Sequence, residues 1–248
     1  MPKTPTDGYW SLPPISRALG TWMFVTSIGI HFGRIPFHWL RYNQFYLRFP
    51  PQIWRLATGC LITGPGLGIV FDTYFLCNAA IYLEKSHPQM RRKEDFIWYL
   101  ISICCFIAVM ECFIPGMPPF PILTEGFIIA LTYTATQRQQ GVQSKLMFIP
   151  FNFPAPLTPY AMILINLLMG GDIVLGIYGL VAGHLWEFLT RIYPEFGGGP
   201  NILKTPWFMT SLVRTGRQFF SSSGVTGGDG ADSGPLPDSW RTKGRRLG

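Results

Sequence analysis

Charged residues are scarce in this chain of 248 residues. Asp, Glu, Lys and Arg make up 13% of it, against about 25% in an ordinary soluble domain, while hydrophobic residues make up 48%. This shortage argues against a soluble globular protein and favours one that is embedded in a membrane. The net charge of +7 does not indicate nucleic-acid binding, because the basic residues form no single stripe and lie in short clusters between apolar runs.

Motifs for metals, disulfides and phosphates are also missing. The five cysteines include no C-x-x-C pair and lie in or beside apolar runs, so we expect reduced, packed thiols. His31, His38 and His87 each lack another His, Cys or carboxylate at ligand spacing on the same segment. The Gly-rich run at 64–68 has no strand before it and no Lys after it, which indicates a distorted helix. The sequence therefore predicts neither a metal site nor a cofactor.

Six apolar runs approach the length of about 20 residues that a helix needs to cross a bilayer. They cover residues 15–32, 57–83, 96–114, 121–136, 156–169 and 173–189. The fourth and fifth are short, which leaves open either imprecise boundaries or a thin hydrophobic belt that thins the bilayer. The predicted fold class is an all-α polytopic membrane protein, a bundle of six transmembrane helices with a flexible cytosolic C-terminal tail, which the motifs described below would make rhomboid-like.

Basic residues between the runs indicate the orientation of the chain. They concentrate in the loops 84–95 and 137–155 and in the tail that begins at Arg191, so the positive-inside rule predicts that both termini are cytosolic. Residues 1–18 are polar and rich in Pro and do not resemble a cleavable signal. We expect three regions: a membrane domain at 1–190, a cytosolic tail and flexible linker at 191–239, and a distinct basic segment at 240–248.

The residues of an intramembrane serine protease are absent. Rhomboid proteases carry G-x-S-G at the start of the fourth helix and H-x-x-G-x-x-x-G on the sixth. The fourth run here contains no Ser, and G-x-S-G occurs nowhere in the chain. On the sixth run Gly179 and Gly183 reproduce the two glycines, but Gly176 occupies the His position and His184 is out of register. We therefore predict that the protein has no catalytic residue and is not an enzyme.

An ordered set of short motifs resembles the Derlin family of rhomboid pseudoproteases. In chain order they are PQIWRL at 51–56, LE at 83–84, EGF at 125–127, FNFPAP at 151–156, G-x-x-x-G-H at 179–184 and LKTP at 203–206. Derlins usually carry Asn at the position of Asp72 and often a basic residue near Asn78. We assign Asp72 and Asn78 to a polar groove, in which Asp72 either faces water or is protonated.

The resemblance implies a non-catalytic role in endoplasmic reticulum-associated degradation. Such a protein would lie in the endoplasmic reticulum membrane beside a ubiquitin ligase complex and pass misfolded client proteins to the cytosol through a lateral groove, thinning the bilayer locally. Trp54 and Arg55 form the Trp-Arg motif of the first loop, with Trp54 at the headgroup level and Arg55 on loop carbonyls or a lipid phosphate. Gly179 and Gly183 would allow close helix packing.

The last nine residues resemble the SHP box, F-x-G-x-G-x-x-L-G, which recruits the valosin-containing AAA ATPase. Its positions correspond to Trp240, Thr242, Gly244, Leu247 and Gly248, with Trp in place of Phe and Thr in place of the first Gly. Trp240 and Leu247 would supply two apolar anchors on an extended strand.

Three alternatives remain open from the residues. One is an active intramembrane protease that pairs Ser27 or Ser102 with His184. Another is a transporter or channel, for which several midplane ionisable residues would be expected. The third is a structural membrane scaffold that has no part in degradation.

Overall fold

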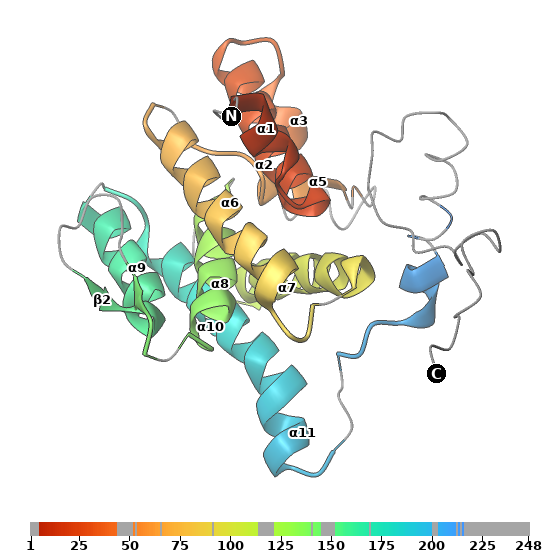
Figure 1. The fold of residues 1–248 in the computed structure, drawn as a ribbon. Coiled ribbons are helices and arrows are strands. Elements are labelled where there is room, and N and C mark those ends of the chain that lie inside the picture. Colours follow the sequence, from red (N-terminus) through yellow and green to blue (C-terminus); the bar gives the residue numbers. More distant parts are fainter. Residues whose placement is uncertain are drawn as a thin grey trace, which may run out of the picture. The chain divides into compact units, whose positions relative to one another are not determined.

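The structure is a computed structural model, and it describes residues 5–43, 52, 54–64, 66–90, 92–113, 122–139, 141–144, 152–168, 170–199, 203–211, 213 and 215 (Figure 1). The chain divides into two units, Met1–Pro206 and Trp207–Gly248. The first unit holds all the helices and strands given below and extends past the predicted end of the membrane domain at residue 190. The SHP-like residues Trp240, Thr242, Gly244, Leu247 and Gly248 lie outside the described residues.

The first unit is helical apart from one short pair of strands. Its elements are α1 (Pro5–Trp10), α2 (Pro14–His31), α3 (Phe37–Leu40), α5 (Trp54–Gly59), α6 (Gly68–Ser86), α7 (Lys93–Phe113), α8 (Thr124–Thr136), β1 (Gln143–Ser144), β2 (Phe153–Pro154), a 3₁₀ turn (Ala155–Leu157), α9 (Thr158–Leu168), α10 (Ile173–Glu187), a π-helical turn (Phe188–Ile192) and α11 (Tyr193–Phe196). The two strands pair antiparallel, Gln143 with Pro154 and Ser144 with Phe153.

Two of the described helical segments, Lys93–Phe113 and Ile173–Phe196, are long and apolar enough to cross a membrane by themselves. Five of the six predicted runs coincide with one helix each, namely α2, α7, α8, α9 and α10. The second run, 57–83, differs from the prediction of one long span. It is divided between α5 and α6, because the chain leaves the helical path after Gly59 and resumes it at Gly68. The Gly-rich run at 64–68 therefore lies in a break between two helices.

Neighbouring side chains bind the polar backbone groups at this break. The Thr63 N–H donates to Ser27 Oγ on α2 at 3.1 Å. The Leu123 N–H, at the start of α8, donates to the Gly59 carbonyl at 2.9 Å, and Thr124 Oγ1 donates to the Ile62 carbonyl. A non-helical segment is tolerated within a membrane protein only where such partners exist.

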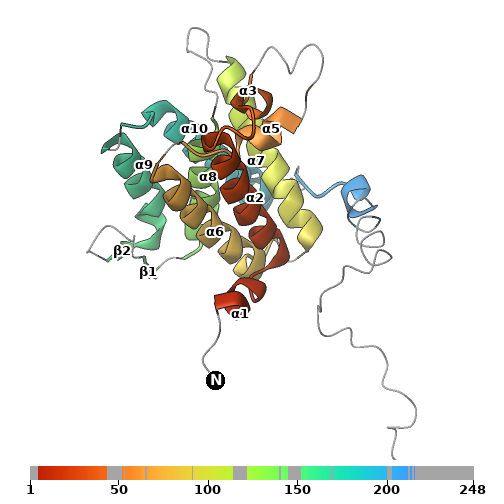
Figure 2. The same ribbon diagram turned by 90° about the horizontal axis from the view of Figure 1, so that it is seen from above.

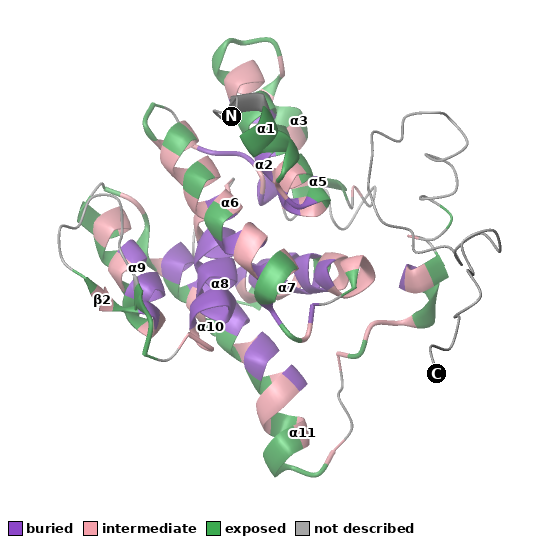
Figure 3. Cartoon of the chain, viewed as in Figure 1, coloured by how far each residue is buried: buried purple, intermediate pink, exposed green. Residues whose placement is uncertain are grey.

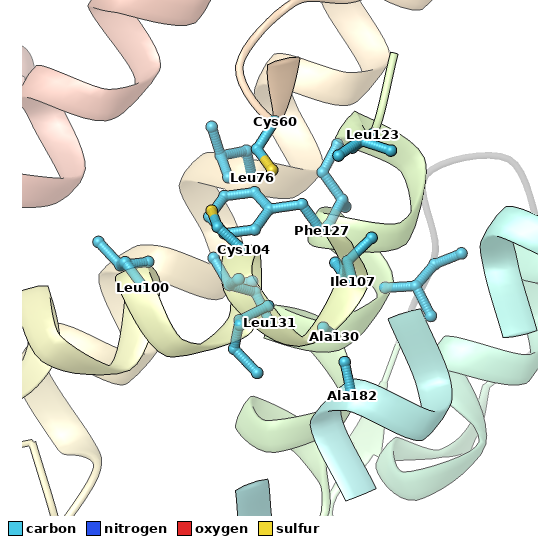
Figure 4. Packing of buried hydrophobic residues seen from close by; sticks show 14 of the residues in the cluster. Cys60, Leu76, Leu100, Cys104, Ile107, Leu123, Phe127, Ala130, Leu131 and Ala182 are labelled. Carbon is cyan, nitrogen blue, oxygen red and sulfur yellow. The ribbon is translucent and has the colours of Figure 1, made fainter. Parts of the chain in front are cut away.

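The core of the unit is built around α8, which packs against α6, α7, α9 and α10 (Figures 1 and 2). Every residue of α8 except Glu125 is buried, so the helix is enclosed on all sides (Figure 3). Its threonine hydroxyls are satisfied by backbone carbonyls, for example Thr134 by Ala130 and Thr136 by Thr132, so they can be buried with the apolar residues. Figure 4 shows Phe127, Ala130 and Leu131 of α8 packed among Leu76, Cys104, Ile107 and Ala182 of its neighbours.

Candidate functional site

Arg55 lies buried at the start of α5 and holds the first loop together. Its Nη1 donates to the carbonyl oxygens of His38, at 2.6 Å, and Arg41, at 3.2 Å, and its Nε donates to Gln52 Oε1. The guanidinium thus joins the backbone of His38 and Arg41 to Gln52, which is close to Arg55 itself in sequence. The adjacent Trp54 is 58% exposed, so the Trp-Arg motif has one side chain directed outwards and one directed into the loop. The anchoring of Trp54 among lipid headgroups remains a prediction.

Glycines of α8 and α10 bring the two helices into backbone contact. A Cβ on Gly179 would collide with the carbonyl group of Gly126, and a Cβ on Gly126 would lie 2.8 Å from the carbonyl oxygen of Leu175. A Cβ on Gly183 would lie 3.0 Å from the carbonyl oxygen of Ala130. Both glycines of the G-x-x-x-G motif therefore face α8, as small residues do where membrane helices approach closely. We call this contact the α8–α10 seam.

Within the part of the chain that the structure describes, neither Ser27 nor Ser102 forms a hydrogen bond with His184. The Nδ1 of His184 hydrogen-bonds to the hydroxyl of Tyr133 at 2.9 Å, across the seam. Ser27 Oγ accepts from the Thr63 N–H, and Ser102 Oγ donates to the Trp98 carbonyl. Ser27, Ser102 and His184, which an unusual protease dyad would require, thus form hydrogen bonds with other residues and not with one another.

Asp72 and Asn78 do not come together at one polar surface. They are six positions apart on α6, Asp72 half-buried and Asn78 exposed. The Asp72 carboxylate is close enough to that of Glu125, on α8, for their charges to interact. Glu125 accepts a hydrogen bond from Asn166 Nδ2 at 2.6 Å. Sequence reasoning missed this Glu125–Asn166 pair, because no local spacing connects residues on α8 and α9.

A second polar cluster, also missed from the sequence, lies where the loop after α6 meets the end of α10. His87 Nε2 is 3.6 Å from Glu187 Oε1, and Arg191 Nη1 is 3.8 Å from Glu187 Oε2. Gln89 Nε2 donates to the Thr190 carbonyl at 3.3 Å. The His87 and Glu187 side chains are almost fully buried, at 0% and 4% exposure. The loop therefore contacts the end of α10 and the π-helical turn through polar side chains, of which those of His87 and Glu187 are buried.

A segment of the predicted cytosolic tail is bound to the start of α7. Trp98 Nε1 donates to the Leu203 carbonyl at 3.1 Å, and Thr205 Oγ1 donates to Asp95 Oδ1 at 2.5 Å. These bonds involve the LKTP stretch at 203–206. Over the part of the chain that the structure describes, no group of three His, Cys, Asp or Glu side chains is arranged to hold a metal ion.

Comparison with known proteins finds relatives of this chain over most of its length. The Derlin-1 of Arabidopsis thaliana is 32% identical over 215 residues, which cover 85% of this chain and 77% of that protein. The Derlin-1.2 of Zea mays is 27% identical over 85% of both chains, and a probable derlin-2 homolog of Dictyostelium discoideum is 26% identical over 84% of this chain and 82% of its own length. The Der1-like family matches residues 12–207. The chain therefore belongs to the Der1-like family.

Proposed function

We propose that this protein is a non-catalytic component of endoplasmic reticulum-associated degradation that helps move misfolded proteins from the endoplasmic reticulum to the cytosol. Family membership supports the coarser statement, that the chain is a membrane-embedded protein with a role in this degradation. The proposal adds six membrane spans, cytosolic termini, a lateral groove, a thinned bilayer and recruitment of the valosin-containing AAA ATPase. Its further partners would be a ubiquitin ligase complex and the misfolded clients.

The length of α8 and α9 is the observation that carries the proposal. With 13 and 11 residues at about 1.5 Å each, they span roughly 20 and 17 Å, against a hydrocarbon core of about 30 Å. The 21 residues of α7 are long enough to cross it. The bilayer beside α9 would have to become thinner to match the length of the helix. A thinner hydrocarbon layer lowers the free-energy barrier for a polar client segment that crosses the membrane.

Polar side chains beside the short helices support a groove. Asp72, Glu125 and Asn166 lie on α6, α8 and α9, and Glu125 and Asn166 are joined by a hydrogen bond. A client backbone that crosses the membrane needs hydrogen-bonding partners, which hydrocarbon does not offer. These residues would supply partners at one end of the shortened path.

The proposal that the protein cuts no substrate is supported by residues of α8 and α10. The position of the protease histidine is Gly176, and His184 is bonded to Tyr133. The experiment for the rival activity is incubation of the purified chain with a transmembrane substrate, alongside Ser27→Ala and Ser102→Ala variants. Cleavage that disappears in either variant would replace the proposed function with that of an active protease.

The test of the whole proposal is client turnover in cells that depend on this chain. Wild type is compared with a chain truncated after Asp238 and with a chain of full length in which residues 221–238 are shuffled. We expect truncation to slow degradation of a misfolded membrane client and to abolish co-purification of the ATPase, while the shuffled linker preserves both. Normal turnover in cells without the chain would instead favour a structural scaffold, and uptake of solute by liposomes containing it would favour a transporter.

A further inference from the structure

A groove runs along the first turns of α2, away from every residue assigned above. It is shallow and open to the outside, has a volume of about 350 Å³, and is lined by Pro14, Arg17, Ala18, Thr21, Trp22 and Val25 of α2 and by Tyr9 of α1. This volume lies at the lower end of the range of about 300–1,000 Å³ that is usual for small-ligand sites. The α2 residues recur at intervals of three and four, so they form one face of the helix.

Arg17 is the cation of this groove, and aromatic rings hold it in place. Its guanidinium carbon lies 4.6 Å from the centre of the Trp10 ring and 5.6 Å from that of Tyr9. The Tyr9 hydroxyl bonds to Thr21 Oγ1 at 2.7 Å, which fixes α1 against α2. Among the described residues no carboxylate forms an ion pair with Arg17. The carboxylate of Glu84 bonds instead to Ile15 and Ser16.

The chemistry of the cation favours an anion as its partner. Arginine stacks on aromatic rings through its face, while the N–H groups at its edge match two oxygens of a phosphate. A quaternary ammonium would need open aromatic faces, and here Arg17 already occupies the rings of Tyr9 and Trp10. The charged end of the groove thus suits phosphate better than choline.

The other end of the groove is apolar. Trp22 and Val25 are 53% and 57% exposed on a helix that is apolar along most of its length. A ligand that fills the groove must therefore carry a negative charge beside Arg17 and hydrocarbon beside Trp22 and Val25. We propose that the groove binds an anionic phospholipid, with its phosphate on Arg17 and an acyl chain along Trp22 and Val25.

The test is native mass spectrometry of the full chain, purified in detergent and mixed with phosphatidylserine or phosphatidylcholine. We expect wild type to retain phosphatidylserine and Arg17→Gln to bind it about tenfold more weakly, since a charge-assisted hydrogen bond to phosphate is lost. The matched control is Arg34→Gln, which removes the same charge at the other end of α2 and should bind as wild type does. Ala18→Trp keeps Arg17 and fills the groove, and it should also lose the lipid.

Each of the other outcomes would overturn the proposal. Equal retention of phosphatidylserine by wild type, Arg17→Gln and Ala18→Trp would mean that the groove holds no lipid. Equal retention of phosphatidylcholine and phosphatidylserine would remove the preference for an anion. Displacement of the lipid by inorganic phosphate alone would assign the site to a free phosphate. Thermal unfolding of each variant is the control for folding: a midpoint equal to that of wild type would show that a loss of lipid binding is not caused by misfolding.

Discussion

The carboxylate of Glu84, near the end of α6, accepts hydrogen bonds from both the backbone N–H and the hydroxyl of Ser16 on α2, each at 2.7 Å. It also accepts the Ile15 N–H at 3.2 Å. The first N–H groups of a helix have no partner within it, and its N-terminus favours negative charge. Glu84 thus caps a helix 68 residues away, and α2 packs chiefly against α6. Glu84 of the Leu-Glu motif at 83–84 therefore binds the N-terminus of α2 to the end of α6.

Replacing Glu84 should loosen α2. Glu84→Gln keeps the shape of the side chain but removes its charge, and we expect it to lower the free energy of unfolding by about 1–2 kcal/mol. Thermal unfolding of the detergent-purified protein measures the change. The adjacent exposed Lys85→Gln is the control, and equal shifts for the two variants would contradict the capping role.

The α8–α10 seam should tolerate no side chain at Gly179. We expect Gly179→Ala to destabilise the protein by ~3 kcal/mol, because the added Cβ meets the backbone of Gly126 and a backbone cannot move aside as a side chain does. Gly183→Ala should have a smaller effect, since its nearest atoms lie at 3.0 Å. Gly8→Ala, which meets nothing within 4 Å, is the control in the same unfolding measurement.

Arg55→Lys should free the first loop although it keeps the charge. Lysine has no planar fork with which to reach the carbonyls of His38 and Arg41 together, so we expect a loss of about 2 kcal/mol and faster cleavage of the loop by added protease. The exposed Arg34→Lys in the same loop should leave the cleavage rate unchanged. Unchanged cleavage in Arg55→Lys would show that the carbonyl bonds do not order the loop.

The contact between His87 and Glu187 should appear as an energetic coupling. In a double-mutant cycle with His87→Ala and Glu187→Gln we expect an interaction of about 1 kcal/mol, since the two buried side chains share one contact. The cycle of His87→Ala with Glu94→Gln should give none. Additive effects in both cycles would mean that the loop after α6 is held by Gln89 and Thr190 alone.

Sequence reasoning worked where the signal was local. The run from Ile173 begins a helix as predicted because Asp172 caps it, its carboxylate accepting the Val174 N–H at 3.0 Å. The motifs that resemble Derlins led to the family that the comparisons show. Composition also indicated correctly that the protein belongs in a membrane.

Sequence reasoning failed where two contacting residues lie far apart along the chain. Hydropathy alone joins residues 57–83 into one span, since it takes no account of Ser27 and Thr124, which hold the break open. The pair Glu125–Asn166 and the pair His87–Glu187 likewise depend on which helices become neighbours. No spacing within a single segment reveals that choice.

The break between α5 and α6 also sets an order of events during synthesis. Its carbonyl at Ile62 is bound by Thr124, which the ribosome adds 62 residues later, and its carbonyl at Gly59 is bound by Leu123. Until α8 has emerged, the stretch after Gly59 lacks these partners, and its backbone is not yet fixed in the final conformation. The break should therefore reach its final form only once α8 arrives, after half of the protein has been made.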